Sequence, residues 1–268
     1  MGAGRRIPVA ITIAGSDSGG GAGIQADLKA FARCGVHGTA AITAITAQST
    51  VAVDAVHSVP PEIIVAQVRA VAEDIGVDAV KVGMLGGVET IDAVVEALGL
   101  TGDAPVVIDP VLVAESGAVL LDPSARDALV KRLLRLATVA TPNLLEAREL
   151  TGLGEGADQV ELARAVRALG PRAAIVTGGH TADNADVLVD DEGEPLRIEG
   201  PRHPDGASHG SGCTHSSVLA AQLARGAGVR DAAREAKRIT SEAVKRGLRE
   251  IGAGAGPVDV LGLEARRT

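Results

Sequence analysis

The chain has 268 residues, of which 46% are hydrophobic, and this length and apolar content suffice for a large core built as a single domain over residues 1–268. Its formal net charge is −8 at pH 7 and its only aromatic side chain is Phe31, which argues against nucleic-acid binding, since that function uses basic patches and stacking rings. No apolar stretch approaches the ~18 residues of a membrane-spanning helix, and the two cysteines, Cys34 and Cys213, fit a protein of the reducing cytoplasm.

The predicted elements alternate between short runs rich in valine and isoleucine and longer segments whose apolar residues recur at helical spacing. The predicted strands are Val9–Ala14, Gly38–Ile45, Ala79–Val82, Pro105–Asp109, Val139–Thr141, Ala173–Thr177 and Asp186–Val189. The predicted helices are Gly23–Cys34, Pro61–Ile75, Gly87–Leu98, Pro123–Leu136, Asn143–Leu150, Ala157–Leu169, Thr214–Arg225 and Arg230–Glu250. This alternation is typical of an α/β protein with a largely parallel sheet.

Three further segments complete the prediction. The first apolar run, Ile7–Ala14, is short and ends in a glycine loop, which predicts a strand rather than a signal peptide. Asp190–Asp205 is polar and rich in proline and glycine, which predicts a hairpin at the sheet edge. Residues 252–268 begin with Gly-Ala-Gly-Ala-Gly-Pro, and we expect a flexible tail there.

Polar or glycine-bearing segments follow most of the predicted strands. They are Gly15–Gly23, Ala47–Thr50, Gly83–Gly87, Pro110–Gly117, Pro142–Asn143 and Gly178–Asn184. In open α/β sheets, ligands bind beyond the carboxyl ends of the strands. We therefore expect these segments to converge on one site.

The strongest local signal is a glycine-containing segment that opens a predicted helix. It reads His-Gly-Ser-Gly-Cys-Thr-His-Ser-Ser over residues 209–217. Glycines allow close approach, and free amides at a helix start present donors to an anion, so the segment predicts a phosphate-binding turn. Cys213 lies at this helix start, a position that lowers the pKa of a thiol and makes it a usable base or nucleophile. The alternative is a buried structural cysteine beside an ordinary helix-entry turn.

Several segments resemble the hydroxymethylpyrimidine/phosphomethylpyrimidine kinases of the ribokinase-like superfamily. Gly210-Ser211-Gly212-Cys213 is similar to the Gly-Thr-Gly-Cys anion-hole motif of that family. Further similar segments, in family order, are Thr12–Lys29, Ile42–Thr50, Lys81–Leu85, Asp109–Val111, Ser116–Gly117, Thr141–Ala147 and Gly178–His180. The resemblance implies a ribokinase-like three-layer α/β/α sandwich with a central, mostly parallel sheet, and it suggests a homodimer.

The resemblance also implies an activity: ATP-dependent phosphorylation of 4-amino-5-hydroxymethyl-2-methylpyrimidine, and then of its monophosphate, in thiamine biosynthesis, with ATP and Mg²⁺ as cofactors. It gives Cys213 the task of accepting or orienting the hydroxyl proton, while amides of the turn stabilise the migrating phosphoryl group. Those amides are Gly210, Ser211 and Gly212.

The implied pyrimidine pocket contains Gln48, whose amide suits the edge of an aminopyrimidine ring, and Met84, whose thioether suits its face. The resemblance adds Gly15, Asp27 and Val111 to this pocket. Considered without the family, Gln48 could cap a loop, Asp27 could be a solvated helix residue, and Met84 could fill the core.

The implied nucleotide side starts with Asp109, at the end of a buried-looking strand, where a carboxylate needs a cation or amide donors. Asn143 and Glu146 have the Asn-x-x-Glu spacing that the superfamily uses to organise magnesium and phosphate; alternatively they form only a helix cap with its capping box. The resemblance implies ATP contacts at Thr177 and Gly179, and a magnesium ion near Asp109 and Glu146, held through water or nucleotide. Thr177 stands where the family usually has a lysine that contacts the nucleotide phosphates.

Two other functions fit the same residues. A pyridoxal or pyridoxine kinase phosphorylates a hydroxymethyl group on a similar six-membered nitrogen heterocycle. A catalytically weak, pyrimidine-binding regulatory protein would keep the fold but consume no ATP, and the missing lysine at Thr177 motivates this alternative. Release of ADP with each candidate acceptor separates the three.

Overall fold

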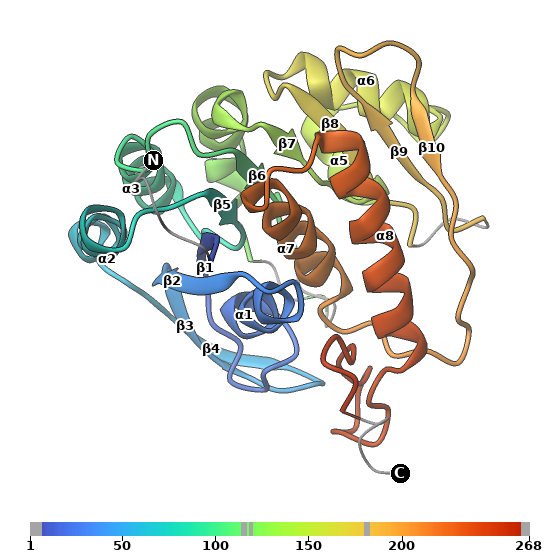
Figure 1. The fold of residues 1–268 in the computed structure, drawn as a ribbon, viewed down its shortest axis with the longest axis horizontal. Coiled ribbons are helices and arrows are strands. Elements are labelled where there is room, and N and C mark those ends of the chain that lie inside the picture. The colour runs from blue at the N-terminus through green and yellow to red at the C-terminus, as the bar shows by residue number, and fades with distance from the viewer. Residues whose placement is uncertain (1–6, 114–116, 118–119, 180–182, 264–268) are drawn as a thin grey trace.

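Eight strands form one central sheet (Figure 1). The computed structural model describes residues 7–113, 117, 120–179 and 183–263. The sheet order is β10-β9-β8-β7-β6-β5-β1-β2, and all neighbours from β8 to β2 are parallel, whereas β9 is antiparallel to β8 and to β10. The strands are β1 (Val9–Ala14), β2 (His37–Ile42), β5 (Ala79–Val82), β6 (Val106–Ile108), β7 (Val139–Ala140), β8 (Ala173–Val176), β9 (Asp186–Val189) and β10 (Leu196–Ile198). The predicted, mostly parallel sheet is confirmed. β9 and β10 form a hairpin at the sheet edge, as expected, but it spans Asp186–Ile198 rather than Asp190–Asp205.

Alternating residues of each strand serve two separate cores, one on each face of the sheet. In β8, Ala173 and Ile175 belong to one core, and Ala174 and Val176 to the other. The first of these cores is covered by α1 (Gly23–Arg33), α7 (Ser211–Ala224) and α8 (Val229–Lys245). The second is covered by α2 (Pro61–Asp74), α3 (Val88–Leu98), α5 (Leu144–Thr151) and α6 (Gln159–Ala168). Figure 1 shows α1, α7 and α8 together on one side of the sheet, so the three-layer sandwich is confirmed.

The segment 123–136, predicted as one helix, is a succession of short turns of different pitch. It consists of η1 (Pro123–Ala125), α4 (Arg126–Ala128), η2 (Leu129–Leu133) and η3 (Leu134–Leu136). Leu129, Leu133 and Leu134 are all buried in the core under α3, although an ideal helix would separate the last two by about 100°. The wider turn at η2 accommodates both.

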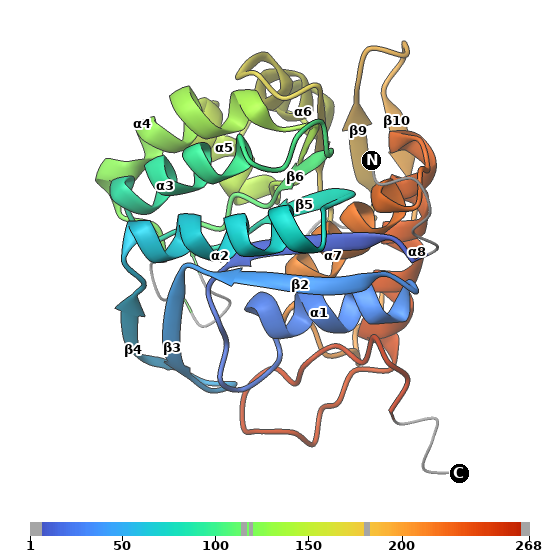
Figure 2. The ribbon, with the colours of Figure 1, turned by 60° about the vertical axis from the view of Figure 1, so that its left-hand side comes forward.

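The predicted strand Gly38–Ile45 divides into two. β2 ends at Ile42, and β3 (Ala44–Gln48) leaves the main sheet to pair with β4 (Val53–Ser58), which the sequence analysis missed. Between them, the Thr43 hydroxyl donates to the carbonyl of Met84 at 2.7 Å and turns the chain over the end of β5. Figure 2 shows the β3–β4 ribbon standing apart from the main sheet. The residues of β4 are mostly exposed, so its sequence lacks the apolar pattern that would have predicted a strand.

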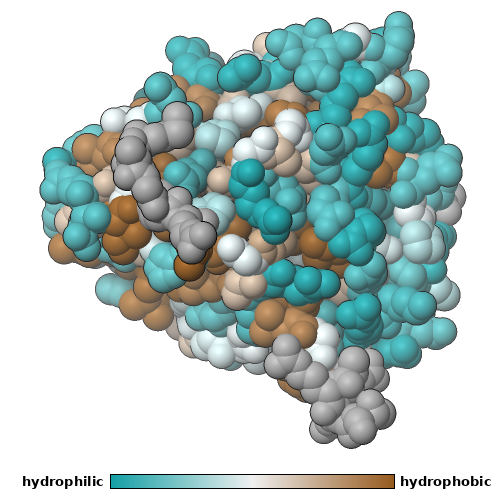
Figure 3. Space-filling view, in the orientation of Figure 1, coloured by the Kyte–Doolittle hydropathy of each residue, from teal (hydrophilic) through white to brown (hydrophobic). Residues whose placement is uncertain are grey.

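The carboxyl-terminal segment returns to the body of the protein. α8 ends at Lys245, five residues before its predicted end, and Val258 and Val260 are buried against the α1/α7/α8 core. The tail was expected to be flexible from residue 252; its last five residues, 264–268, lie outside the described part of the chain. Charged side chains pair along the outward surface of α8, and Figure 3 is mostly hydrophilic over this side of the molecule. Of the helices that the structure describes, none combines the length and the apolar character needed to cross a bilayer.

Candidate active site

The candidate site lies at the edge where the parallel strands end, next to the start of α7. Gly15 follows β1, Met84 follows β5, Asp109 follows β6, Asn143 follows β7 and Thr177 follows β8, each within three residues of its strand. Because parallel neighbours end at the same edge, the structure brings these five positions together. The hydrogen bond from Ser216 to Asp109 places the N-terminal part of α7 beside them.

The turn that begins α7 leaves backbone amides available to a ligand. Gly210, with φ +80°, precedes the helix without a side-chain cap. The Ser211 N–H donates to the carbonyl of Ser208 at 2.9 Å, whereas the Gly212 and Cys213 N–H groups have no partner in the described parts of the chain. These amides sit at the positive end of a 14-residue helix, where an anion is favoured. We call residues 210–213 the phosphoryl cradle. Of the three amides expected there, that of Ser211 is already used, whereas those of Gly210 and Gly212 have no partner among the described residues; the Cys213 amide was not expected.

The pKa of the Cys213 thiol differs from the predicted one. Burial raises its pKa to about 12; the ammonium of Lys81 opposes this rise, and the carboxylates of Asp27 and Asp109 add to it. The expectation that the helix start lowers the thiol pKa is therefore wrong, because desolvation and two nearby carboxylates outweigh the helix dipole. At neutral pH Cys213 keeps its proton, so it can orient a hydroxyl group but offers little thiolate.

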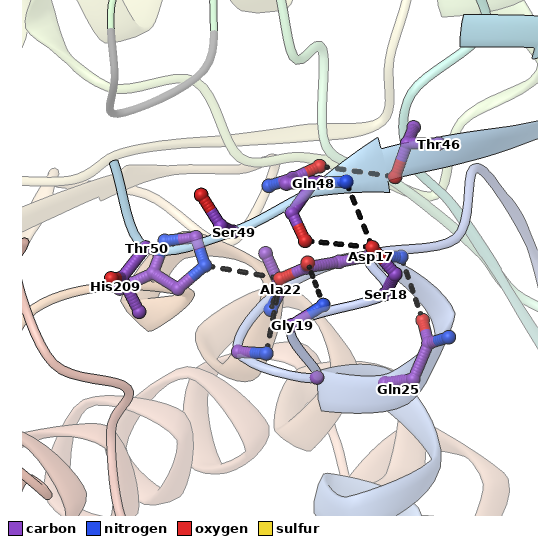
Figure 4. Close-up of polar contacts among 12 residues, drawn as sticks. Asp17, Ser18, Gly19, Ala22, Gln25, Thr46, Gln48, Ser49, Thr50 and His209 are labelled. Carbon is purple, nitrogen blue, oxygen red and sulfur yellow. Dashed lines mark hydrogen bonds and ion pairs between the residues drawn. The ribbon is translucent and has the colours of Figure 1, made fainter. Parts of the chain in front are cut away.

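The candidate substrate wall is formed by β3 and the substrate loop, our name for residues 15–23. The Ser18 hydroxyl donates to the Gln48 carbonyl at 2.7 Å and accepts from the Gln48 N–H at 2.8 Å (Figure 4). Gly15 lies directly under Met84, since a Cβ at Gly15 would come 2.9 Å from Sδ. Gln48, Met84 and Gly15 thus share one wall, and half-buried Val111 follows β6 at the same edge.

Asp27 lies beneath this wall in a fully buried ion pair. Lys81 Nζ is 3.0 Å from both carboxylate oxygens, Thr12 donates to the carboxylate at 2.6 Å and Ser217 at 2.7 Å. Both charged side chains are 0% exposed, so the structure places Asp27 under the floor of the site rather than on an open wall. Burial favours a neutral amine, but the charge of Asp27, with a smaller contribution from Asp109, raises the pKa of Lys81 above its usual value. The sequence analysis gave Lys81 no role, although a lysine inside the short apolar strand β5 was a usable signal.

Three consecutive side chains of α7 reach three buried aspartates. His215 Nε2 lies 3.1 Å from Asp186, Ser216 donates to Asp109 at 3.0 Å and Ser217 donates to Asp27. These aspartates come from β9, from the loop after β6 and from α1, so one helical turn ties three elements to the cradle.

Asp109 and Glu146, the two carboxylates expected to bind the nucleotide's metal ion, lie close enough for the charge of Asp109 to act on Glu146. Burial raises the pKa of Asp109, although Lys81 and Ser216 oppose the rise, and burial together with the charge of Asp109 raises the pKa of Glu146 to about 8. Asn143 caps α5 in a full capping box with Glu146, with N···O distances of 2.9 Å in both directions. Glu146 can serve both as part of the cap and as a metal ligand, because its carboxylate keeps lone pairs that the capping box does not use.

The donor set fits magnesium. Two desolvated carboxylates, one of which raises the pKa of the other, are stabilised by a divalent cation. Among the described residues, no group of three or more histidine, cysteine, aspartate or glutamate side chains could hold a metal ion. A Mg²⁺ ion would therefore keep waters and take oxygens from nucleotide phosphates, as is usual for this ion.

The loop after β8 carries Thr177 and Gly179, the remaining residues expected to contact the nucleotide. The Thr177 N–H donates to Pro142 at 2.9 Å, which brings the loop next to Asn143, and Gly179 is exposed. The Gly178 N–H donates to Asp186, whose carboxylate also accepts from Lys237 at 2.9 Å. The buried ammonium of Lys237 therefore lies close to the loop in which Thr177 stands in place of the family's lysine. The motif residues Ser116 and His180 lie outside the described residues.

Known proteins are similar to this chain in both sequence and structure. The family model for phosphomethylpyrimidine kinase matches residues 17–259. The hydroxymethylpyrimidine/phosphomethylpyrimidine kinase of Streptomyces coelicolor is 46% identical over 254 residues, covering 94% of each chain. A Bacillus subtilis pyridoxal kinase in complex with ADP aligns at 37% identity with a TM-score of 0.87 over 96% of this chain and 99% of that one. A Clostridium difficile phosphomethylpyrimidine kinase aligns at 39% identity with a TM-score of 0.78 over 89% of this chain and 100% of that one.

The sheet order, the free amides of α7 and the likeness to these structures define a ribokinase-like small-molecule kinase. The match to the family model covers most of the chain, and the relative from Streptomyces agrees with it nearly end to end. The chain belongs to the phosphomethylpyrimidine kinase family, as the resemblance predicts.

Proposed function

We propose that the protein transfers the γ-phosphoryl group of ATP to the hydroxymethyl group of 4-amino-5-hydroxymethyl-2-methylpyrimidine, and then a second phosphoryl group to the monophosphate, in the supply of thiamine. The observation that carries this proposal is the phosphoryl cradle, with its free Gly212 and Cys213 amides, linked to a wall that presents the Gln48 amide. A donor-acceptor amide reads the edge of an aminopyrimidine, and bare amides hold a phosphoryl group.

In this reaction the hydroxymethyl oxygen attacks the γ-phosphorus, the bond from that phosphorus to the β,γ-bridging oxygen breaks, ADP leaves and the hydroxyl proton is lost. The cradle amides stabilise charge on the migrating group, and each such donor is typically worth about 2.7–4 kcal/mol. The neutral Cys213 thiol orients the attacking hydroxyl rather than serving as a preformed thiolate. Lys81 beneath the site adds positive charge near the developing anion.

ATP would lie between the cradle and the ends of β6, β7 and β8, against Asn143, Thr177 and Gly179. Asp109 and Glu146 would hold Mg²⁺ through water or phosphate oxygens, since burial raises the pKa of both carboxyls, the charge of Asp109 adds to the rise at Glu146, and a cation would relieve both effects. When bound, the ion neutralises charge on the phosphates.

A coupled assay of ADP release tests the function directly. We expect release that depends on Mg²⁺ and on hydroxymethylpyrimidine, with a background without acceptor at least about 100-fold lower, because positioning of the acceptor supplies most of the acceleration. Mass spectrometry of the product would detect the monophosphate and the diphosphate. Tight pyrimidine binding without ADP release would instead support the regulatory alternative.

Pyridoxal phosphorylation is the second candidate, favoured by the structural likeness to pyridoxal kinase. The Gln48 amide supports the pyrimidine, because its oxygen can accept from an exocyclic amino group while its NH₂ donates to a ring nitrogen, a pairing that an aminopyrimidine edge matches. A kcat/KM for pyridoxal above that for the pyrimidine would reverse this assignment.

We also propose that the protein is a cytoplasmic homodimer. Its free cysteines fit a reducing compartment. The outer face of the β3–β4 ribbon presents Ile45, which is 53% exposed, with Ala47 and Ala55 beside it. A two-stranded ribbon is marginal in water, and a second copy would cover its apolar face.

Ile45→Asp is therefore expected to halve the mass observed by analytical ultracentrifugation, because it buries a charge in the proposed interface. Ile63→Asp, on the exposed side of α2, is the control and should leave the mass unchanged. A wild-type monomer at micromolar concentration would contradict the dimer.

A further inference from the structure

The substrate loop and the phosphoryl cradle meet in a contact between residues 192 positions apart. His209 Nε2 lies 3.0 Å from Oδ2 of Asp17 (Figure 4). Asp17 is 1% exposed and His209 is 8% exposed, so water competes little for this contact. An ionised carboxylate only accepts, which means that Nε2 carries the proton and donates it.

The Asp17 carboxylate also organises its own loop. Oδ1 accepts from the Gly19 N–H at 2.8 Å, and Oδ2 accepts from Gly21 at 3.0 Å and from Ala22 at 2.7 Å. Burial opposes ionisation, but the bond from His209 and these amides outweigh it and hold the pKa of Asp17 below its usual value. One side chain therefore fixes the path of the substrate loop and its distance from His209.

The substrate loop also fixes the position of Gln48, the residue of β3 that is proposed to bind the edge of the pyrimidine. Ser18, next to Asp17, exchanges two hydrogen bonds with the Gln48 backbone, and the Asp17 N–H donates to Gln25 at 2.9 Å. A continuous path of short contacts therefore runs from His209 through Asp17 and Ser18 to Gln48.

His209 is equally fixed on the side of the cradle. Its N–H donates to Gly256 at 3.2 Å, and its carbonyl accepts from Val258 at 3.1 Å, so the carboxyl-terminal segment holds its backbone. Its ring fills the space over Gly21, where a Cβ would lie 2.1 Å from Cδ2. The next residue in the chain is Gly210, the first of the cradle.

We propose that His209 and Asp17 are positioning residues for phosphoryl transfer: their contact sets the distance between the Gln48 wall, which holds the acceptor, and the cradle, which holds the migrating group. This proposal rests on the proposed kinase function and adds residues to its machinery. Because each reactant touches a different side of the contact, its loss disturbs their alignment more than the binding of either. A displacement of about 1 Å between reactants costs on the order of 100-fold in rate.

The test is the steady-state kinetics of His209→Ala. We expect kcat to fall about 100-fold while KM for the pyrimidine and for ATP changes by less than about threefold. His209→Gln, whose amide can still donate to Asp17, should recover at least about tenfold of the loss, and added imidazole should partly rescue His209→Ala. His203→Ala, in the same connecting segment but bonded to Ser241, is the control and should keep the wild-type kcat.

Wild-type ADP release is measured first, so that the two ideas fail separately. No release with any acceptor would reject the kinase function itself. Normal wild-type release with an unchanged kcat in His209→Ala, or a change confined to KM, would reject only the positioning role. Should His209→Ala fail to fold, Asp17→Asn takes its place, because its amide turns one acceptor into a donor facing N–H groups, and the same kcat-selective loss is expected.

Discussion

Replacing Lys81 with methionine is expected to lower the free energy of unfolding by about 3–5 kcal/mol, because the change leaves the Asp27 carboxylate buried without its cation. Thr12 and Ser217 would still donate to that carboxylate, but neutral donors do not balance a charge that is 0% exposed. Methionine nearly matches the lysine in volume, so the loss reports charge rather than a cavity. Urea denaturation followed by circular dichroism measures it.

Two further variants make this result specific. Lys131→Met breaks a surface ion pair with Asp127 and should leave the urea midpoint unchanged, since exposed pairs contribute little. Adding Asp27→Asn to Lys81→Met should recover part of the loss, because the unpaired charge is then gone. A loss below about 1 kcal/mol in Lys81→Met would show that Asp27 is neutralised by other means, and the charge balance of the site would need a new account.

The fold was predictable because it rests on patterns that lie close together in the sequence. The Asn143–Glu146 capping box and the alternation of short apolar runs with helical spacing are local signals, and the structure has the corresponding helix and sheet. β4 was not predicted, because it packs on β3 alone and its residues are mostly exposed. Its sequence therefore lacks the buried face that marks a strand.

The chemistry of the site was less predictable, because it depends on contacts between distant residues. Lys81 and Asp27 are 54 positions apart, and His209 and Asp17 are 192 apart, so no spacing rule detects either pair. Cys213 shows why neighbouring residues in the sequence are not enough to predict a pKa. Its position at a helix start suggests a lowered thiol pKa, but burial raises it. A helix dipole is visible in the sequence, whereas desolvation is a property of the assembled core.

Gly210→Ala is expected to reduce kcat at least about 100-fold, because the cradle amides would no longer point at the phosphoryl group. Gly210 has φ +80°, and a Cβ there would lie 1.8 Å from the carbonyl oxygen of Gly21. One of the two segments must therefore move, which separates the cradle from the substrate loop. The measurement is kcat from ADP release, together with the melting temperature of the variant.

Two other glycines, one in the first turn of α7 and one just beyond its last residue, separate strain from function. Gly226, at the far end of α7, has φ +87° and open space around it, so Gly226→Ala carries similar backbone strain without the clash and should keep its kcat. Gly212 has open space and no such strain, so Gly212→Ala should keep its stability; its new methyl group would nevertheless stand where the phosphoryl group approaches a bare amide, and kcat should fall. Full activity in Gly212→Ala, with loss only in Gly210→Ala, would show that the turn has a structural role only and that the phosphoryl group binds elsewhere.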